Sequence, residues 1–192
     1  MAEKTTQLLD FLKTIEPFKR IEREVYYSDG RKETDAEHSW HVAMFCWLFH
    51  KDFPGTDLCR MLKMALMHDL VEIYAGDTFA FDKCGQEGKK EREKVAADKL
   101  FAQLPDELKT EFTQLFEEYE SESTQEAKIV KSFDKLQPTV QNLCSDGRGW
   151  KEHNITFKQV DEYKRKHMTH NKTILELYEK IMNEAKERKL LE

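Results

Sequence analysis

Apolar residues recur at intervals of three and four positions along most of this sequence, which is the spacing of one face of an α-helix. Leu58, Leu62, Ala65 and Ile73 form one such stripe. Glycine, which weakens helices, is scarce at 7 of 192 residues, and 39% of the residues are hydrophobic, enough for one modest core. We therefore predict an all-α fold, a single compact helical bundle over residues 1–192, and exclude an all-β fold.

Turn and capping signals place the boundaries of the predicted helices. We expect residues 22–35 to form a loop, because the apolar periodicity disappears around Ser28-Asp29-Gly30. Thr34 to Glu37 have capping-box spacing, so a helix of about four turns should begin near Asp35 and end before Pro54. The remaining expectations are helices over residues 5–15, 56–76, 89–104, 105–119 and 124–140, an irregular segment at 77–88, a kink at Pro138, and a charged helical extension from about residue 155.

The charge balance limits the partners of this chain. Lys and Arg total 31 against 37 Asp and Glu, a net charge of −6 that repels nucleic-acid phosphates. A small phosphorylated substrate is still allowed, because a metal ion or a few local cations can reverse the field inside one cleft. The longest apolar run, Val42 to Phe49, is far shorter than the roughly 20 residues that span a bilayer. We expect a cytoplasmic protein with reduced cysteines and no membrane or nucleic-acid partner.

His68 and Asp69 stand side by side in an otherwise apolar helical segment. Burial of an unpaired carboxylate is costly, and a divalent cation bound by both side chains would remove that cost. A hydrogen-bonded core histidine beside an arginine-paired aspartate would remove it too. His38 and Asp134 interrupt two other apolar stripes in the same way. Together the four side chains suit one Mn, Fe, Co, Ni, Zn or Mg ion and leave coordination positions open for water and substrate.

Two further carboxylates follow the His-Asp pair. Glu72 lies four residues beyond His68, which on one helix is the same face one turn along, and there it could hold or deprotonate a metal-bound water. Asp77 directly follows Gly76, a helix-ending residue, and is predicted to be a second carboxylate at the rim of the site. The alternative for Asp77 is a turn-stabilising role.

The order and spacing of His38, His68-Asp69 and Asp134 resemble the H…HD…D pattern of the HD-domain metal-dependent phosphohydrolases. The segments 36–39, 68–72 and 75–77 are similar to the small branch that contains bacterial 5'-deoxynucleotidases and their eukaryotic relatives. The resemblance extends over roughly residues 9–149. It implies an all-α HD domain, commonly a homodimer, that hydrolyses a phosphate ester of a nucleotide with one divalent metal.

The same resemblance implies which residues meet the substrate. In that branch an arginine before the first histidine contacts the phosphate, and its position corresponds to Arg23, with Arg20 as the alternative if the register is shifted. Lys83, after the Gly-Asp pair, is a second candidate. Glu24 stands where the bacterial enzymes carry a tryptophan that disfavours ribose, so a preference for deoxyribose does not carry over to this chain.

The function predicted on this basis is hydrolysis of a (deoxy)ribonucleoside 5'-monophosphate. Glu72 would orient the metal-bound water or take its proton, Asp77 would position that water or protonate the leaving oxygen, and Arg23 would neutralise the phosphoryl group. One alternative is a nucleoside triphosphate or nucleotide-analogue phosphohydrolase with a more basic pocket, supplied by Lys83, Lys89 and Lys90. Another is a non-catalytic, metal-stabilised interaction protein.

The sequence also predicts where several other polar and aromatic residues lie. His41 is predicted to donate a hydrogen bond behind the metal ligands, and His50 to lie on the surface. Trp40 and Trp47 are expected in the core or in a homodimer interface, together with the first helix. Phe79 is expected to pack in the same way or to touch a nucleotide base.

Overall fold

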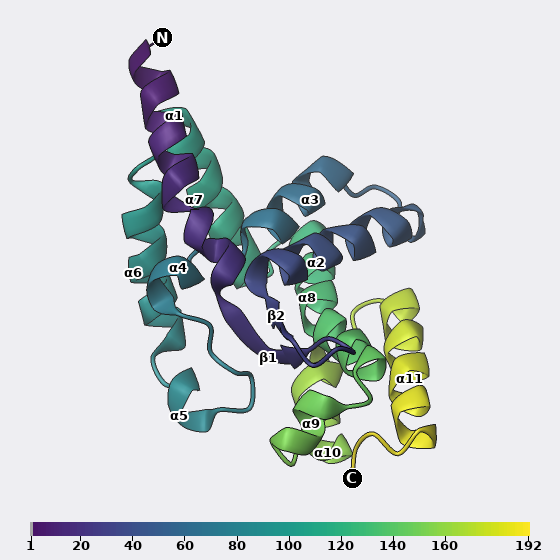
Figure 1. The fold of residues 1–192 in the computed structure, drawn as a ribbon. Helices are drawn as coiled ribbons and strands as arrows, with labels where there is room; N and C mark the ends of the chain where they lie inside the picture. Colours follow the sequence, from purple (N-terminus) through teal and green to yellow (C-terminus); the bar gives the residue numbers. More distant parts are fainter. Residues whose placement is uncertain (1) are drawn as a thin grey trace.

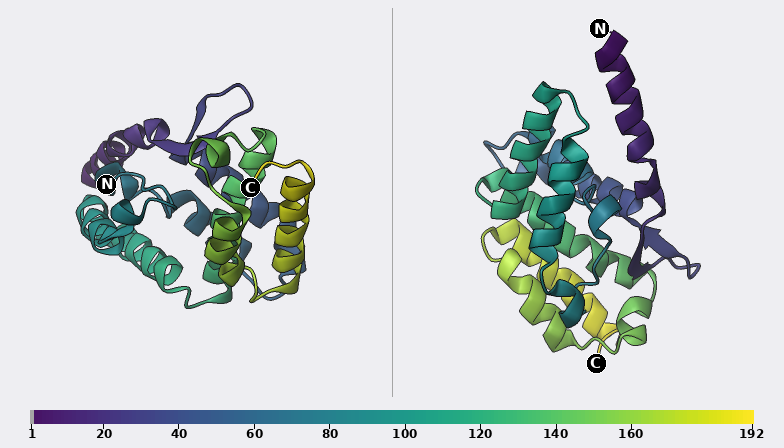
Figure 2. Two further views of the ribbon diagram at one scale, coloured as in Figure 1. Left: turned by 90° about the horizontal axis from the view of Figure 1, so that it is seen from below. Right: turned by 90° about the vertical axis from the view of Figure 1, so that its left-hand side faces the viewer.

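The computed structural model describes residues 2–192, and their fold is predominantly helical, as predicted (Figure 1). The first helix, α1 (Ala2–Thr14), is followed by a short 3-10 helix at Glu16–Arg20. Among the side chains of residues 3–14 that the structure describes, Phe11 is the one that is buried, and its ring packs edge-on against Phe112 at a centroid distance of 6.0 Å. The right-hand view of Figure 2 shows the amino-terminal half of α1 standing away from the other helices.

Residues 22–34 form a β-hairpin, so the prediction of a loop there is wrong. Strand β1 (Glu22–Tyr26) pairs antiparallel with β2 (Lys32–Thr34), with Glu22 opposite Thr34 and Tyr26 opposite Lys32. The register is irregular between these two pairs, because β1 has more residues there than β2. The hairpin was missed because its inward-facing positions include charged residues, which hide the usual alternation of apolar and polar side chains.

The helix predicted at Asp35 is present, with the predicted capping box. The Thr34 side chain accepts a hydrogen bond from the backbone of Glu37, and the Glu37 side chain accepts one from the backbone of Thr34. Helix α2 (Asp35–Phe49) continues into a 3-10 turn at His50–Asp52 and ends before Pro54. The cap therefore fixes the start of α2 directly against the end of β2.

The single helix predicted over residues 56–76 is instead two helices, and Asp57 rather than Thr56 caps the first. Helix α3 (Leu58–Met67) stops before His68, and the short helix α4 (Glu72–Ala75) follows. Between them the backbone bonds are the tighter three-residue type, such as Glu72 N to Asp69 O at 2.9 Å. The tighter turn rotates Glu72 away from the position that a continuous α-helix would give it.

Helices α6 (Lys89–Phe101) and α7 (Asp106–Ser121) form an outer layer, as predicted. Short helix α5 (Lys83–Gln86) lies in the segment expected to be irregular. Helix α8 (Gln125–Cys144) is central and contacts α2, α3, α7, α11 and β1 (Figure 1). Its Ile129, Phe133 and Leu136 side chains are fully buried, and Pro138 lies within its helical span.

The carboxy-terminal segment comprises α9 (Arg148–Glu152), α10 (Phe157–Lys164), a 3-10 helix at Arg165–His167 and α11 (Lys172–Glu187). Although α11 is rich in charges, its Ile174, Tyr178 and Met182 side chains are buried, and the helix packs against α8. Among residues 2–192, no helix has both the length and the apolar composition needed to cross a bilayer.

Candidate active site

Three separate helical segments bring the four predicted metal ligands together. His38 comes from α2, His68 and Asp69 from the turn after α3, and Asp134 from α8. The Nε2 atom of His38 lies 3.3 Å from Asp134 Oδ1 and 3.7 Å from Asp69 Oδ2. The Nε2 atom of His68 lies 3.2 Å from Asp69 Oδ2 and 3.9 Å from Asp134 Oδ1. Two imidazoles and two carboxylates therefore converge on one buried point.

The orientation of the two histidines fits a metal ion. His38 Nδ1 donates to Gln137 Oε1 at 2.7 Å, and His68 Nδ1 donates to the Ala65 carbonyl at 2.9 Å, so in both rings Nε2 is the nitrogen that faces the carboxylates. Both Nε2 atoms are buried without a hydrogen-bond partner among the described residues. Burial, assisted by the Arg23 guanidinium, lowers the pKa of His38 to about 4, so this ring is neutral, as a metal ligand must be.

A hydrogen-bonded chain behind His38 was missed by the sequence analysis. Gln137 Nε2 donates to Glu33 Oε1 at 2.6 Å and to His41 Nδ1 at 3.2 Å. His41 thus lies behind the predicted ligand, but it accepts a hydrogen bond where the sequence analysis expected it to donate. Gln137 interrupts the buried stripe of α8, as Asp134 does, and that signal could have identified it.

Glu72 and Asp77 lie together, but beside Asp35 and not on the His68 side. One oxygen from each of these three carboxylates lies within 4.8 Å of the other two. Burial, followed by the Asp69 and Asp35 carboxylates, holds the pKa of Glu72 well above its ordinary value. Burial likewise raises the pKa of Asp35 to about 7 and raises that of Asp77. Such a cluster can hold a proton or a hard divalent cation.

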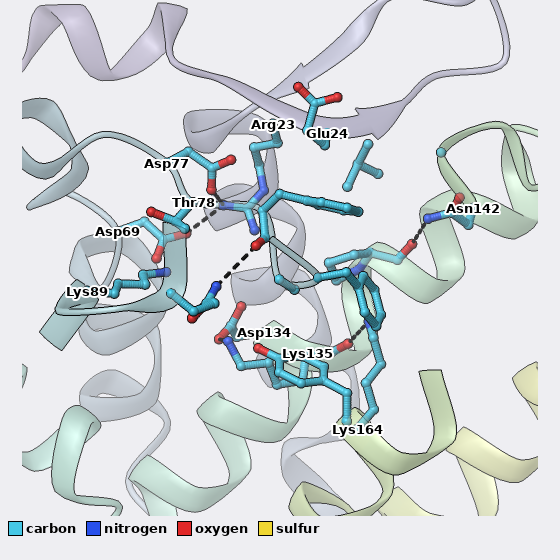
Figure 3. Close-up of a pocket in the computed structure, with 18 of the residues that line it drawn as sticks. Arg23, Glu24, Asp69, Asp77, Thr78, Lys89, Asp134, Lys135, Asn142 and Lys164 are labelled. Carbon is cyan, nitrogen blue, oxygen red and sulfur yellow. Dashed lines mark hydrogen bonds and ion pairs between the residues drawn. The ribbon is translucent and has the colours of Figure 1, made fainter. Parts of the chain in front are cut away.

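Arg23 connects this carboxylate cluster to the predicted ligands. Its Nη1 atom lies 2.8 Å from Asp69 Oδ2, 3.0 Å from Asp35 Oδ1 and 3.9 Å from Asp77 Oδ1. Figure 3 shows the side chain reaching down from β1 toward Asp69 and Asp77. The alternative Arg20 is exposed and pairs with Glu16 at 2.7 Å, away from the site.

A cavity opens beside Arg23, and its far wall is largely aromatic. We call it the aromatic cavity, and its lining includes Phe79, Phe81, Trp150 and Tyr163 as well as Arg23, Glu72 and Asp77. Lys135 and Lys164 form its floor (Figure 3). Phe79 therefore lines a site and is more than a packing residue.

Glu24 has one partner on the neighbouring strand β2 and one just after helix α9. Its carboxylate lies 2.6 Å from Lys32 Nζ and 3.2 Å from His153 Nε2. These hydrogen bonds lower the pKa of Glu24, with the bond to Lys32 as the main cause. The His153 ring in turn lies 4.5 Å from the Phe79 ring, centroid to centroid.

Lys83, the second predicted phosphate contact, is not brought to the site. It lies at the exposed start of α5 and, within residues 2–192, lines neither the aromatic cavity nor the larger cavity described below. Lys89 at the start of α6 is the cation that reaches the cluster, with its Nζ atom 3.7 Å from Glu72 Oε1.

The remaining predicted residues lie outside the cluster. His50 is half-buried, and its Nε2 atom lies 3.0 Å from the Thr56 carbonyl oxygen. Trp40 and Trp47 are 61% and 63% exposed, so the expectation that they pack in the core of this chain is wrong.

Comparison with protein families matches residues 15–176 to the HD domain. The chain belongs to the HD domain family. This HD domain is 36% identical over 138 residues to 5'-deoxynucleotidase HDDC2 of Xenopus laevis, which covers 71% of this chain and 68% of that protein. It is 34% identical over 136 residues to the human 5'-deoxynucleotidase HDDC2, with 70% and 66% coverage. About two thirds of each relative is thus represented here.

Solved structures agree with this assignment. A crystal structure of a predicted metal-dependent phosphohydrolase from Magnetospirillum magnetotacticum superimposes with a TM-score of 0.90 at 34% identity, and covers 98% of this chain and 95% of that one. The resemblance to HD-domain metal-dependent phosphohydrolases, and with it the prediction of an enzyme, is confirmed. An HD domain implies a divalent metal ion, for which the histidine and aspartate cluster provides the donor set.

Proposed function

We propose that this HD domain hydrolyses the phosphate ester of a (deoxy)ribonucleoside 5'-monophosphate to a nucleoside and inorganic phosphate. The observation that carries the proposal is the pair of buried Nε2 atoms, on His38 and His68, that lack a hydrogen-bond partner among residues 2–192 and face two carboxylates. We assign His38, His68, Asp69 and Asp134 as ligands of one divalent ion, whether Co, Mn, Mg, Ni, Fe or Zn. The relatives named 5'-deoxynucleotidase support a nucleotide as the substrate.

The bound ion would supply Lewis acidity and a water of lowered pKa. Arg23, directly beside Asp69, neutralises charge on the phosphate group and orients it. Glu72 accepts the proton of the attacking water, because a raised pKa makes its carboxylate a stronger base than that of an ordinary glutamate. Asp77, also with a raised pKa, protonates the leaving oxygen of the nucleoside. The P–O bond to that oxygen breaks as the bond from water to phosphorus forms.

The aromatic cavity is the candidate site for the nucleoside. Phe79, Phe81 and Trp150 offer apolar ring faces to a base in a cavity that Arg23 also lines. Glu24 and His153 stand at the hairpin side of this wall, where a charged carboxylate can accept hydrogen bonds from sugar hydroxyls. This arrangement supports activity on ribose as well as on deoxyribose substrates.

The test is phosphate release from ribo- and deoxyribonucleoside mono- and triphosphates, with Co, Mn, Mg or Ni restored after chelation. We expect metal-dependent release from a monophosphate in the wild type and a loss of at least about 100-fold in Asp69→Asn, which removes a ligand charge. The matched control is Asp10→Asn, an exposed residue of α1 that pairs only with Lys13 among described residues. Release that persists in Asp69→Asn, or no release with any metal and nucleotide, contradicts the proposal.

A nucleoside triphosphate is the second candidate substrate. The observation that favours it is a larger basic cavity that shares Asp69 and Asp134 with the aromatic cavity and has Lys89 and Lys90 in its wall. These are two of the three lysines from which the sequence predicted a basic phosphate pocket.

A further inference from the structure

A second and larger cavity adjoins the aromatic cavity at the predicted metal ligands. We call it the lysine cavity, because its wall carries five lysines and one partly buried histidine: Lys89, Lys90, Lys131, Lys135, Lys166 and His167. Asp69 and Asp134 line both cavities, as do Lys89 and Lys135. The ligand cluster therefore forms the boundary between two openings, one aromatic and one basic.

The lysines of this cavity fall into two groups. Lys131 pairs with Glu120 at 2.8 Å, and Lys135 pairs with the predicted ligand Asp134 at 2.9 Å. Lys90 on α6 and Lys166 on the 3-10 helix after α10 lie on different elements at the exposed edge of the cavity. Neither has a carboxylate within 4.0 Å among residues 2–192. Two cations at the entrance therefore lack a carboxylate partner within residues 2–192, and Lys166 Nζ lies over the Tyr163 ring, 5.7 Å from its centroid.

The lysine cavity is the more positive of the two cavities, because its lysines equal its carboxylates in number, whereas the aromatic cavity has one cation fewer than carboxylates. The lysine cavity has five lysines against five carboxylates, and two of those carboxylates, Asp69 and Asp134, belong to the metal cluster. A divalent ion at Asp69 and Asp134 would add the same charge to both cavities, and it would leave the wall of the lysine cavity with a net positive charge. The pKa of His167 is consistent with a positive environment in this cavity. Burial, followed by repulsion from Lys135, Lys166 and Lys131, lowers it to about 4.

The lysines that line this cavity indicate which kind of molecule it can bind. Lysine ammonium groups bind phosphate as point charges, and several of them around one opening suit a group with many oxygens and more than one charge. The aromatic cavity suits the nucleoside and has four cationic side chains against five carboxylates. A phosphate at the boundary would thus have its nucleoside on one side and the lysines on the other.

We propose that the lysine cavity binds phosphate groups beside the predicted metal ligands, with the nucleoside in the aromatic cavity. This orientation rests on the proposed function, but the binding itself does not. The phosphate can be the inorganic phosphate that leaves after hydrolysis, or the distal phosphates of a nucleoside di- or triphosphate. Both sources have the same chemistry, and kinetics can separate them.

The first experiment measures binding without turnover. Tripolyphosphate is titrated calorimetrically into protein loaded with Mn²⁺, with the same free Mn²⁺ concentration in cell and syringe, because this probe itself chelates divalent ions and the positive charge of the wall depends on the bound ion. The variant Lys90→Gln/Lys166→Gln removes both unpaired cations at exposed positions, where the fold is not at risk. The matched control Lys158→Gln/Lys172→Gln removes the same charge from side chains that are 82% and 88% exposed and line neither cavity.

We expect the cavity variant to bind tripolyphosphate at least about tenfold more weakly than the wild type, which is about 1.4 kcal/mol, and the control to bind within about twofold of it. Equal weakening in both variants would mean that only the overall charge matters, and it would overturn the proposal. Absence of tripolyphosphate binding to the wild type at millimolar concentration would overturn it as well. Neither outcome depends on whether the enzyme hydrolyses nucleotides.

Steady-state kinetics then identify the source of the phosphate. If distal phosphates occupy the cavity, Lys90→Gln/Lys166→Gln raises KM for triphosphates about tenfold and leaves KM for monophosphates unchanged. If released phosphate occupies it, the inhibition constant for inorganic phosphate rises about tenfold with a monophosphate substrate. No change in either constant would contradict a role at the reaction site. A wild type that binds tripolyphosphate but hydrolyses nothing would refute the proposed function alone.

Discussion

Gln137 shows how one buried side chain can fix the geometry of a predicted metal ligand. Its amide oxygen accepts from His38 Nδ1, and its amide nitrogen donates to Glu33 and His41, so the amide cannot turn over without losing three hydrogen bonds. Burial raises the pKa of Glu33 to about 7, and the carboxyl remains an acceptor in either protonation state. The hairpin thereby helps to orient a ligand on α2 through a residue of α8.

Substitution of Gln137 should weaken metal binding. Without the amide oxygen the His38 ring loses the partner that sets its tautomer, so we expect Gln137→Met to bind Mn²⁺ about 10 to 100-fold more weakly by calorimetric titration. The control is Gln141→Met, since Gln141 is also buried on α8 but donates to the Tyr26 carbonyl and does not touch His38. Equal losses of metal affinity in the two variants would show that Gln137 has only a structural role.

Lys164 predicts a pH dependence of stability. Its Nζ atom donates to the Lys135 carbonyl and, at 2.9 Å, to Thr139 Oγ1, with no carboxylate partner among the described residues. Burial, followed by repulsion from Lys135, lowers its pKa from 10.5 to about 7. Between these two values the unfolded chain holds the proton and the folded chain does not, so stability must rise with pH across this window.

The variant Lys164→Met lacks this titration. We expect the free energy of unfolding of the wild type, relative to that of Lys164→Met, to increase between pH 7 and about pH 9.5, by up to about 1.4 kcal/mol per pH unit. Urea unfolding at several pH values measures this difference, and Lys180→Met, at an exposed position of α11, is the control. If the difference in unfolding free energy between the wild type and Lys164→Met stays constant with pH, the buried Lys164 amine remains charged.

Whether a site residue could be predicted depended on the residues around it in the sequence. The His-Asp pair, His38 and Asp134 each interrupt an apolar stripe, and that contrast made them visible as candidate ligands. Their assignment as ligands stays a prediction, although the structure brings them together. Lys83 and Lys89 have no such contrast, because both lie in a charged stretch. Only the fold could show that Lys89, at the start of α6, is the one that faces the site.

At the scale of elements, the long amphipathic helices were predictable and the elements around the site were not. Helices α2, α6, α7 and α8 have apolar stripes with the helical period, so their positions were predicted within a few residues. Strands β1 and β2 and the turn after α3 direct charged side chains, including Arg23 and Glu33, into the site. An inward-facing charge has the same sequence signature as an exposed loop, so these elements could not be recognised.

The start of α2 joins this hairpin to the ligand helix and yields a prediction about capping. Thr34→Ala removes the side chain that accepts from the Glu37 backbone, and we expect a loss of about 1 kcal/mol of stability. Thr156→Ala is the matched control, because Thr156 forms an equivalent capping box with Gln159 at the start of α10. Both variants should lose similar stability in urea unfolding.

Only Thr34→Ala should also weaken Mn²⁺ binding, because β2 and α2 carry Glu33 and His38 on either side of this cap. The comparison separates a general loss of stability from a local change at the site. If Thr156→Ala lowers the metal affinity as much as Thr34→Ala does, then the cap of α2 has no special connection with the metal centre.

At the scale of the whole molecule, the helices gather around α8, while one face of α2 remains uncovered. Trp40, Trp47 and Leu48 are 61%, 63% and 72% exposed, and the two tryptophans lie seven residues apart, which is two helical turns. Exposed tryptophans on one helix face are unusual for a monomer and typical of interfaces. The homodimer predicted from the sequence remains a prediction, and this face is its candidate interface.

A dimer through α2 has a direct test. Light scattering after size exclusion should give the wild type twice the chain mass of 22.8 kDa, and Trp40→Glu/Trp47→Glu the mass of one chain, since burial of two carboxylates in an apolar contact is unfavourable. Circular dichroism checks that the variant remains folded. The control Val95→Glu places a charge at another exposed apolar position, on α6, and should stay dimeric. A wild type that elutes with the mass of one chain at all concentrations would refute the dimer. A dimer that persists in Trp40→Glu/Trp47→Glu would show that the contact lies elsewhere. The exposed Leu9 and Leu12 of α1 would then be tested next.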